Sequence, residues 1–307
     1  MTIASHLSLK PGEVVDSKFR IGRRLGAGGL GSVYSAWDLL TERGVAIKML
    51  DAGPQTRLFA EAAALASVSS RNVVQLYGAG WHRSRPYLVM ELVEGDALAS
   101  HREWDLHAQL SFLSQVCLGL ADVHAAGLLH RDIKPANTLV ERGTGRVVLL
   151  DFGAACAWSA ARDSIVGTPD YLAPELLMGE LATVAADVYS VGVLAYEFLT
   201  GVNPFFDDSV TRTLERHLTF APDPPSRLRP RLGPCDALIL AAIDKSPGNR
   251  PTSALSLAHA LEASAASIRQ DGAWDLGPAK PREQPGQSTP TTVTLHIPQR
   301  LRRGAGS

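Results

Sequence analysis

Hydrophobic and polar residues alternate along 19–50, and this run is interrupted by a glycine cluster and by one charged turn. A period of two residues is typical of half-buried strands, so the segment predicts three antiparallel strands. Two more strands are predicted at 73–77 and 86–90, and the Ala-rich segment 55–68 that precedes them predicts a helix. The chain as far as Val93 therefore predicts a five-stranded antiparallel sheet with one main helix.

The pattern changes after Ala97, where apolar residues recur every three to four positions and indicate helices. Helices are predicted at 106–126, 174–178, 184–200, 234–244 and 253–268, short strands at 138–140 and 147–150, and a Pro- and Arg-rich loop at 221–234. This change predicts an α+β fold in two lobes, of which the second is mainly helical. We place an N-terminal extension at 1–18, a first lobe at 19–93, a second lobe at 94–268 and a flexible Pro- and Thr-rich tail at 269–307.

The tail differs from the rest of the chain in composition. Residues 277–292 are dense in Pro, Gly, Gln, Ser and Thr, which disfavours a packed core. The short segment 293–297 that follows can form a strand on a surface edge. The tail also contains four candidate autophosphorylation sites, Thr289, Thr291, Thr292 and Thr294. A tail that is not modified is the alternative.

Composition and charge exclude several classes of protein. The 307 residues are 45% hydrophobic, which is enough to form a large hydrophobic core. Their net charge is −1, so the chain has no overall electrostatic field that attracts nucleic acid. The three cysteines form no Cys-x-x-Cys pair, so neither a disulfide framework nor a zinc site is expected. No signal peptide is visible, and the most apolar stretch, 184–199, contains Asp187 and Glu197, so we expect no membrane span and a cytoplasmic location.

The glycine cluster at 26–31 fits the pattern G-x-G-x-x-G, which occurs in phosphate-binding loops and in ordinary turns. A dinucleotide-binding loop would run into a helix, whereas residues 32–37 have the pattern of a strand. A Walker loop would continue with Gly-Lys-Ser or Gly-Lys-Thr, and this chain does not. The segment therefore predicts a hairpin lid whose backbone N–H groups approach phosphate oxygens, and a hairpin without a ligand is the alternative.

Lys48 ends the hydrophobic strand that follows this hairpin. A solvated lysine at a strand end is the ordinary interpretation of such a position. Here the predicted helix carries Glu61, which is the only acidic residue in 52–90. We therefore expect Lys48 to bind phosphates and Glu61 to hold it through an ion pair.

Two short segments farther along carry the densest chemistry. Residues 130–137 read His-Arg-Asp-Ile-Lys-Pro-Ala-Asn and supply a carboxylate at Asp132, an ammonium at Lys134 and a carboxamide at Asn137. The Asp-Phe-Gly segment that begins at Asp151 supplies a second carboxylate on a turn. These groups suit a site where Mg²⁺ ions and an acceptor hydroxyl meet the terminal phosphate of ATP.

These motifs, in this order, resemble the eukaryotic-type (Hanks-type) Ser/Thr protein kinases, and most of all their bacterial members. The resemblance covers about residues 19–266. It rests on the glycine loop and Val33, Val-Ala-Ile-Lys at 45–48, Glu61, the segments 130–137 and 151–153, Gly-Thr-Pro-Asp-Tyr-Leu-Ala-Pro-Glu at 167–175, the segment 187–193, and Arg250. It implies a bilobal kinase fold.

The resemblance also implies roles for individual residues. The catalytic set is Asp132, which would orient the acceptor hydroxyl and accept its proton, with Lys134, Asn137 and Asp151. The implied cofactors are ATP and Mg²⁺, for which Mn²⁺ can substitute, with the metal held by Asn137 and Asp151. The implied nucleotide-binding residues are Leu25, Gly26, Ala27, Gly28, Gly29, Leu30, Gly31, Val33, Ala46, Lys48, Glu61, Met90, Glu91, Val93 and Leu139.

The implied activity is transfer of the γ-phosphoryl group of ATP to Ser and Thr hydroxyls of protein substrates, with autophosphorylation in trans within a dimer as one arrangement. Lys134 and Thr168 match the Ser/Thr-specific branch of the family. One alternative is a pseudokinase that acts as an ATP-binding scaffold, which usually requires loss of a residue such as Lys48 or Asp132. A small-molecule phosphotransferase is another, but such relatives typically lack the Ala-Pro-Glu segment and Arg250.

Further matches imply structural and regulatory roles. Glu175 is expected to pair with Arg250, Asp187 to bind the backbone of the catalytic loop, and a hydrophobic column to join the lobes through Leu65, Leu76, His130 and Phe152. The short spacing between Lys48 and Glu61 suggests a shortened helix that makes their pair harder to form. For regulation, we expect phosphate on Ser164 to bind Arg131, with Asp163 as the alternative fixed anion.

Overall fold

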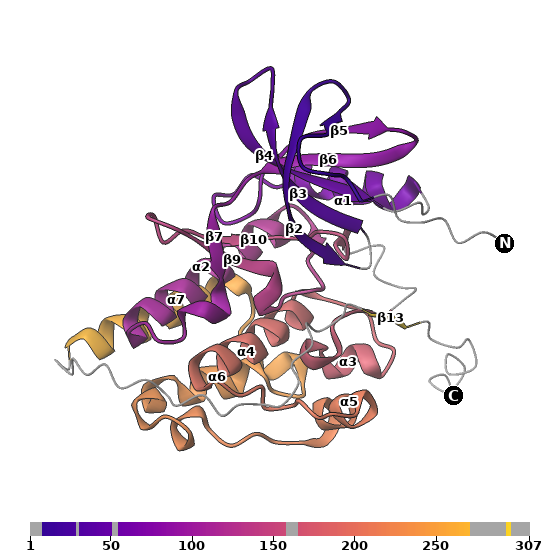
Figure 1. The fold of residues 1–307 in the computed structure, drawn as a ribbon. Coiled ribbons are helices and arrows are strands. Elements are labelled where there is room, and N and C mark those ends of the chain that lie inside the picture. Colours follow the sequence, from indigo (N-terminus) through magenta and orange to yellow (C-terminus); the bar gives the residue numbers. More distant parts are fainter. Residues whose placement is uncertain (1–7, 29–30, 51–54, 158–164, 271–292, 296–307) are drawn as a thin grey trace, which may run out of the picture.

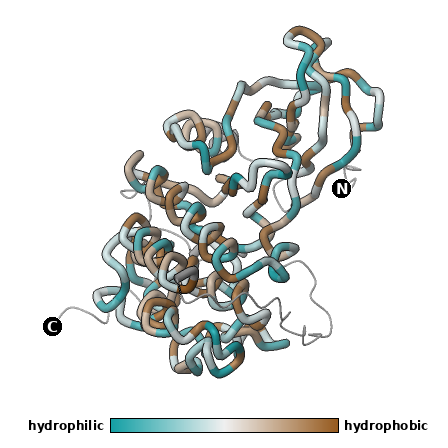
Figure 2. The backbone as a smooth tube through the Cα atoms, turned by 90° about the vertical axis from the view of Figure 1, so that its left-hand side faces the viewer, coloured by the Kyte–Doolittle hydropathy of each residue, from teal (hydrophilic) through white to brown (hydrophobic). Residues whose placement is uncertain are grey.

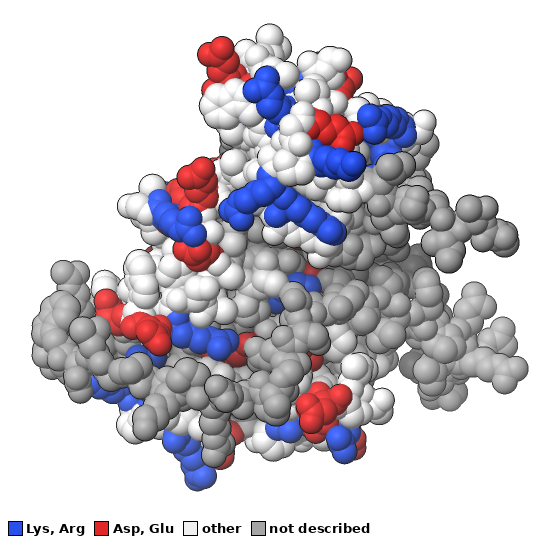
Figure 3. Space-filling model, in the orientation of Figure 1, with Lys and Arg blue, Asp and Glu red and all other residues white. Residues whose placement is uncertain are grey.

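The computed structural model describes residues 8–28, 31–50, 55–157, 165–270 and 293–295. A curled antiparallel sheet with one helix forms the upper part in Figure 1, and a mainly helical part lies below it. The predicted α+β fold is therefore confirmed. Acidic and basic side chains are interspersed on the face shown in Figure 3, in keeping with the net charge of −1.

The upper sheet has six strands in the order β1-β2-β3-β4-β6-β5. They are β1 (Val14–Val15), β2 (Phe19–Gly28), β3 (Gly31–Asp38), β4 (Arg43–Leu50), β5 (Leu76–His82) and β6 (Arg85–Glu91). The predicted count of five was wrong by one, because β1 comes from the segment interpreted as an extension. A two-residue strand has no readable period, and β1 forms through a tight turn in which Asp16 and Ser17 have positive φ.

The fourth predicted strand was misplaced. It was expected at 73–77, whereas β5 begins at Leu76. Val73 and Val74 pair instead with the lower part of the molecule, where the Val74 N–H donates to the Leu149 carbonyl at 3.0 Å. Both valines are buried there, so their apolar character reflects the contact between the two parts and not a strand of the upper sheet.

Alternation along β4 divides its side chains between two hydrophobic cores. Val45, Ile47 and Met49 belong to a core within the upper sheet. Ala46 and Leu50 belong to a second core that continues through both parts of the molecule. Because the side-chain period of a strand is two, Lys48 lies on the same face of the sheet as Ala46, toward the second core. Figure 2 shows hydrophobic and hydrophilic positions mixed along the backbone of both parts of the molecule.

The helices are α1 (Gln55–Ser67), α2 (Leu106–Ala125), α3 (Pro174–Leu177), α4 (Val184–Thr200), α5 (Val210–Thr219), α6 (Asp236–Ala242) and α7 (Ala254–Gln270). The central helix α4 is buried along nearly its whole length, with Thr183 as its N-cap and Gly201 at φ +83° as its C-cap. Helix α5 was not predicted. It is short and mostly polar: it buries only Thr213 and His217, and its apolar residues Val210, Leu214 and Leu218 are exposed or only partly buried.

Short elements complete the described chain. The strands are β7 (Gly95–Ala97), β8 (Leu128–Leu129), β9 (Thr138–Glu141), β10 (Val147–Leu149), β11 (Cys156–Ala157), β12 (Ile165–Gly167) and β13 (Val293–Leu295). The 3₁₀ helices are Leu98–His101, Pro135–Asn137, Pro169–Tyr171, Pro225–Arg227, Pro230–Cys235 and Pro247–Asn249. The described part of 293–297 is thus a strand, and it pairs with β12. Across the described segments, every helix is too short or too polar to cross a membrane.

Candidate active site

Lys48 on β4 binds two carboxylates that come from different parts of the fold. Its Nζ lies 2.6 Å from Oε1 of Glu61 on α1 and 2.7 Å from Oδ1 of Asp151, which follows β10. The predicted Lys48–Glu61 ion pair is therefore present, and the short spacing between the two residues does not prevent it. The contact with Asp151 was not predicted. Together the three groups connect the sheet, its helix and the lower part of the molecule.

The two carboxylates of this cluster differ in exposure. The Glu61 side chain is 3% exposed and that of Asp151 is 42% exposed. Burial raises the pKa of Glu61, and the Lys48 ammonium only partly offsets this. For Asp151 burial acts in the same direction, but the Lys48 ammonium outweighs it and holds the pKa below its ordinary value. The two anions in turn raise the pKa of Lys48 against the opposing effect of its burial, so Lys48 is charged at neutral pH.

The backbone around Asp151 is held in an unusual conformation. Asp151 has φ +56°, and its carboxylate accepts a hydrogen bond from the Gly153 N–H at 3.2 Å. The next residue, Phe152, packs its ring against that of His130 at 4.8 Å between centroids. Burial lowers the pKa of His130, and its neutral ring donates from Nε2 to the Leu150 carbonyl. These contacts fix Asp151 beside Lys48 despite the strained backbone.

Asp132 lies at the centre of a second cluster of polar side chains. Its Oδ1 accepts the Thr168 hydroxyl at 2.7 Å, and its Oδ2 accepts from Nδ2 of Asn137 at 2.8 Å. Lys134 places its Nζ 2.9 Å from the same Oδ2 and 2.8 Å from the Thr168 oxygen. All four side chains are buried, so their geometry is fixed before any acceptor arrives.

Asp187 at the start of α4 holds the backbone that carries Asp132. Its carboxylate accepts the N–H groups of His130 and Arg131, each at 2.9 Å, as the resemblance implied. Hydrogen bonds from His124 and this backbone hold the pKa of Asp187 below its ordinary value, although burial opposes them. Arg131 has φ +68°, and its guanidinium donates to Sγ of Cys156 at 3.0 Å. The backbone that precedes Asp132 is thus held by a buried carboxylate.

The glycine hairpin connects β2 and β3, which pair from Gly26 opposite Val33 to Gly28 opposite Gly31. Gly31 has φ +144°, and a Cβ there would lie 2.0 Å from the Met49 carbonyl, so no other residue fits. The sheet forms the remaining expected nucleotide surface: Val33 is opposite Lys48, and Ala46 is opposite Met90. Gly29 and Leu30 lie outside the described residues.

The segment between the two parts of the molecule contains two more of the expected nucleotide contacts, Glu91 and Val93. Glu91 ends β6, and Leu92, Val93 and Glu94 belong to no strand or helix. The side chain of Glu91 forms an ion pair with Arg146, which also binds Glu141 at 2.9 Å. Arg146 was missed by sequence analysis. Its partner Glu91 is 55 positions away in the sequence, and one arginine in a turn gives no signal. Leu139 lies on β9, and Leu25 on β2 is 40% exposed.

The donor set for a metal is small. Within the described segments, no three residues among His, Cys, Asp and Glu come together in a metal-binding arrangement. Asp151 with an exposed carboxylate, and Asn137 with its carboxamide, would therefore hold Mg²⁺ only together with phosphate oxygens and water. Mg²⁺ is commonly bound through one or two carboxylates plus substrate phosphates, so the residues present fit it.

A third charged group is separate from the clusters of Lys48 and Asp132. The Arg250 guanidinium forms a two-pronged pair with the Glu175 carboxylate, at 2.7 and 2.8 Å. It also donates to the carbonyls of Ala185 at 2.8 Å and Asp244 at 2.8 Å. The predicted Glu175–Arg250 pair is present, and it ties α3 to the segment that precedes α7.

With this geometry, the chain belongs to the protein kinase family, since the family description "Protein kinase domain" matches residues 19–261. It is 38% identical to the serine/threonine-protein kinase Pkn1 of Myxococcus xanthus over 261 residues, which cover 80% of this chain and 38% of Pkn1. It is 36% identical to the serine/threonine-protein kinase PknL of Mycobacterium tuberculosis over 270 residues, which cover 83% of this chain and 67% of PknL. This chain thus spans well under half the length of Pkn1.

Among solved structures, the kinase domain of PknI from Mycobacterium tuberculosis has a TM-score of 0.67 and 24% sequence identity to this chain. The alignment covers 84% of this chain and 100% of that domain. At this identity the likeness supports the fold alone, and it agrees with the two-part architecture described above.

Proposed function

We propose that this chain is a protein Ser/Thr kinase that transfers the γ-phosphoryl group of ATP to hydroxyl groups of protein substrates. The observation that carries the proposal is the buried set around Asp132, in which Thr168 and Lys134 both contact one carboxylate. A serine or threonine hydroxyl entering beside Thr168 meets a proton acceptor and a cation together. Family membership supports the use of ATP and a divalent metal, typically Mg²⁺.

Each residue then has a physical task. Asp132 orients the acceptor hydroxyl and takes its proton, while the Lys134 ammonium stabilises charge on the transferring group. Lys48 binds phosphate oxygens, and Glu61 keeps the Lys48 side chain in place. Asp151 and Asn137 hold Mg²⁺, which neutralises charge on the phosphates when bound. Positioning and electrostatics supply the rate enhancement, because phosphoryl transfer needs little covalent chemistry from the protein.

Finer statements belong to the same proposal. The nucleotide-binding residues implied by the resemblance, from Leu25 to Leu139, surround ATP, and Mn²⁺ substitutes for Mg²⁺. Autophosphorylation in trans, outside the tail, uses a transient dimer. We keep the division between the lobes at 93/94 and the end of the second lobe at 268, while the first lobe includes β1, which pairs with β2. A cytoplasmic location is part of the same proposal. The Ser164 switch also stays a prediction, because Ser164 and Asp163 lie outside the described residues and Arg131 already contacts Cys156.

The pseudokinase alternative has little support. Such a scaffold tolerates loss of Lys48, Asp132, Asn137 or Asp151, whereas this chain retains all four and forms the Lys48–Glu61 pair. A buried and fully assembled polar cluster is costly to keep without a task.

The test incubates the purified chain with labelled ATP, Mg²⁺ and a library of Ser-, Thr- and Tyr-containing peptides. We expect phosphoserine and phosphothreonine but no phosphotyrosine, and loss of transfer when the metal is removed with a chelator. Binding of ATP without transfer to any peptide or to the chain itself would refute the kinase proposal and favour the scaffold.

A further inference from the structure

The tail of the chain returns to the candidate active site. Strand β13 pairs antiparallel with β12, so that Leu295 lies opposite Ile165, Thr294 opposite Val166 and Val293 opposite Gly167. In Figure 1, β13 lies between the upper sheet and α3, far from the end of α7. These two strands form a sheet of their own, so β13 is the partner that β12 has along this edge.

Strand β12 leads directly into the cluster of polar side chains around Asp132. The residue after Gly167 is Thr168, whose hydroxyl contacts Asp132 at 2.7 Å and accepts from Lys134 at 2.8 Å. Gly167 itself has φ +148° and packs tightly, since a Cβ there would lie 2.9 Å from the Arg131 carbonyl. A strand on β12 is therefore held at a fixed distance from the catalytic loop.

The direction of β13 determines which of its ends lies nearer to Thr168. Because the strands are antiparallel, the path from Leu295 back to Val293 follows β12 toward Thr168. Thr292 directly precedes Val293 in the sequence, and it and Thr291 lie outside the described residues. Thr291 comes one step earlier, and Thr294 lies within the strand itself.

The chain is long enough for this pairing to be intramolecular. Helix α7 ends at Gln270 and β13 begins at Val293. The intervening residues 271–292, fully extended, span about 75 Å, more than the diameter of a domain of this size. A tail tethered in this way also has a high effective concentration at the site.

We propose that the tail is an intramolecular substrate of the kinase: β13 docks on the edge of β12 and one of Thr291, Thr292 and Thr294 receives the phosphoryl group. This inference rests on the proposed function. The occupied edge uses the same main-chain pairing by which extended peptides add to a sheet. The tail has hydroxyls on both sides of Val293, so it is suited to accept phosphate and not merely to block the site.

The transfer balances without any further reactant. The threonine oxygen bonds to the γ-phosphorus, while the bond from that phosphorus to the bridging oxygen of ADP breaks and its electron pair leaves with ADP. The hydroxyl proton passes to Asp132. While β13 occupies β12, another extended peptide cannot pair there, so the tail also competes with protein substrates.

The test uses the full chain after phosphatase treatment and follows phosphorylation by mass spectrometry across a wide dilution series. We expect phosphate on one or more of the three threonines, with a first-order rate constant that does not change with chain concentration. A rate constant that rises in proportion to concentration would mean transfer between molecules and would overturn the proposal. Absence of phosphate from these threonines would do the same.

Two variants distinguish the docking of β13 on β12 from the transfer of phosphate to the tail threonines. The triple variant Thr291→Val, Thr292→Val, Thr294→Val keeps β-branched side chains but removes the hydroxyls, so it should lose tail phosphorylation and still compete with peptide substrates. The variant Val293→Pro, Thr294→Pro removes at least one N–H that faces β12, because successive N–H groups point to opposite edges. It should slow tail phosphorylation at Thr291 and Thr292 and lower KM for a peptide with kcat unchanged. An unchanged tail rate and KM in this variant would contradict docking.

A free Ser/Thr peptide serves as the control in every assay. Transfer to that peptide without intramolecular transfer to the tail refutes only this inference. No transfer to any acceptor refutes the proposed function itself.

Discussion

The upper sheet and the lower part of the molecule each contain a buried cation with carboxylate partners, but the two arrangements differ. Arg250 is fully buried, and Glu175 and three carbonyls surround its guanidinium. Lys48 is shared between Glu61, which is buried, and Asp151, whose side chain is 42% exposed. The first group is saturated with partners, whereas the second has one carboxylate that can exchange its partner for a metal ion.

This difference separates charges that stabilise the fold from charges that serve the reaction. A buried guanidinium with every direction satisfied cannot change partners without a large cost. A lysine between two carboxylates can give up one contact and keep the other, so phosphates can enter without leaving a bare charge. The predictions below test this contrast, beginning with the largest expected effect.

Asp132→Asn removes the proposed proton acceptor while keeping the size of the side chain, although only one of the two acceptor oxygens then remains for Thr168 and Asn137. We expect kcat to fall on the order of 10²–10⁴-fold, since that is the contribution of a positioned general base. ATP affinity should stay nearly unchanged, because the proposed role of Asp132 is toward the acceptor hydroxyl and not toward the nucleotide. Titration with a fluorescent ATP analogue beside a rate assay checks both, and full activity at saturating ATP would eliminate the assigned role.

Arg250→Met removes the buried guanidinium and leaves the Glu175 carboxylate alone. We expect the free energy of unfolding to fall by about 3–5 kcal/mol, the cost of breaking a buried pair from one side. Urea unfolding followed by circular dichroism measures this. In the folded fraction the KM for ATP should match the wild type; a raised KM with normal stability would place Arg250 on the reaction side of the comparison.

Lys48→Met and Glu61→Gln should each weaken productive ATP binding, with the milder effect for Glu61→Gln because Lys48 keeps Asp151. Since both changes break one ion pair, their losses should not add, and we expect a coupling of about 0.5–3 kcal/mol in kcat/KM. The double variant completes the cycle. Losses that sum fully would show that Glu61 does not act through Lys48.

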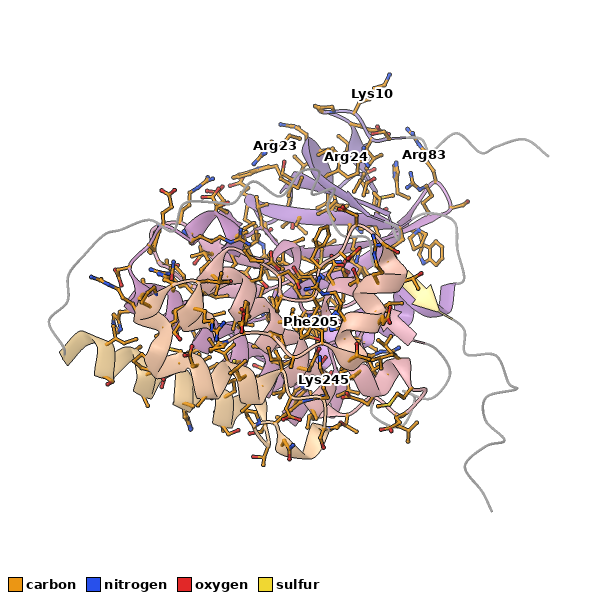
Figure 4. The ribbon with its side chains drawn as sticks, turned by 90° about the horizontal axis from the view of Figure 1, so that it is seen from below. Lys10, Arg23, Arg24, Arg83, Phe205 and Lys245 are labelled. Atoms are coloured by element: carbon orange, nitrogen blue, oxygen red, sulfur yellow. The ribbon has the colours of Figure 1, made fainter. Side chains whose placement is uncertain are left out.

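His217 on α5 gives a pH-dependent contribution to stability. It is buried against Phe205 and hydrogen-bonded to the Tyr189 hydroxyl. Lys245 lies 4.1 Å from the centre of the Phe205 ring (Figure 4). Burial and the nearby Lys245 charge lower the pKa of His217 to about 3. The unfolded chain binds this proton near pH 6.5 and the folded chain does not, so the stability contribution is complete above that pH and declines as pH falls toward 3.

At pH 5 this one group should cost about 2 kcal/mol relative to pH 8. Urea unfolding at both pH values, in the wild type and in His217→Phe, measures the difference. The variant should show a smaller loss on acidification. An equal loss in both proteins would mean that His217 is protonated in the folded state.

Short-range chemistry was readable from the sequence, and long-range pairing was not. Lys48, Asp132 and Asp151 stand in short motifs whose residue types and spacing define their chemistry. The 103 positions between Lys48 and Asp151 gave no signal of their contact, and the same holds for Arg146 and its partner Glu91. Such contacts depend on how distant elements pack, which a local period does not encode.

The fold shows the same limit. Strands and helices with a clear period were predicted within a few residues, and α4 was predicted with its observed bounds, 184–200. The polar helix α5 and the two-residue β1 were missed, because burial in each depends on tertiary neighbours and not on an apolar pattern. The pairing of β13 with β12 could not be predicted at all, since the sequence of a short apolar segment does not indicate which strand it pairs with.

The most direct test of the central contrast makes the same chemical change in both clusters. Glu61→Gln and Glu175→Gln each neutralise one buried carboxylate, and both the phosphoryl-transfer rate and the free energy of unfolding are measured for each. We predict that Glu61→Gln lowers kcat/KM on the order of 10- to 100-fold and lowers stability by less than Glu175→Gln does, because Lys48 keeps its contact with Asp151. Glu175→Gln should instead lower stability by about 3–5 kcal/mol with kcat/KM of the folded protein retained. If both variants lost stability and kept their rate, the Lys48 cluster would be structural and the account would be wrong.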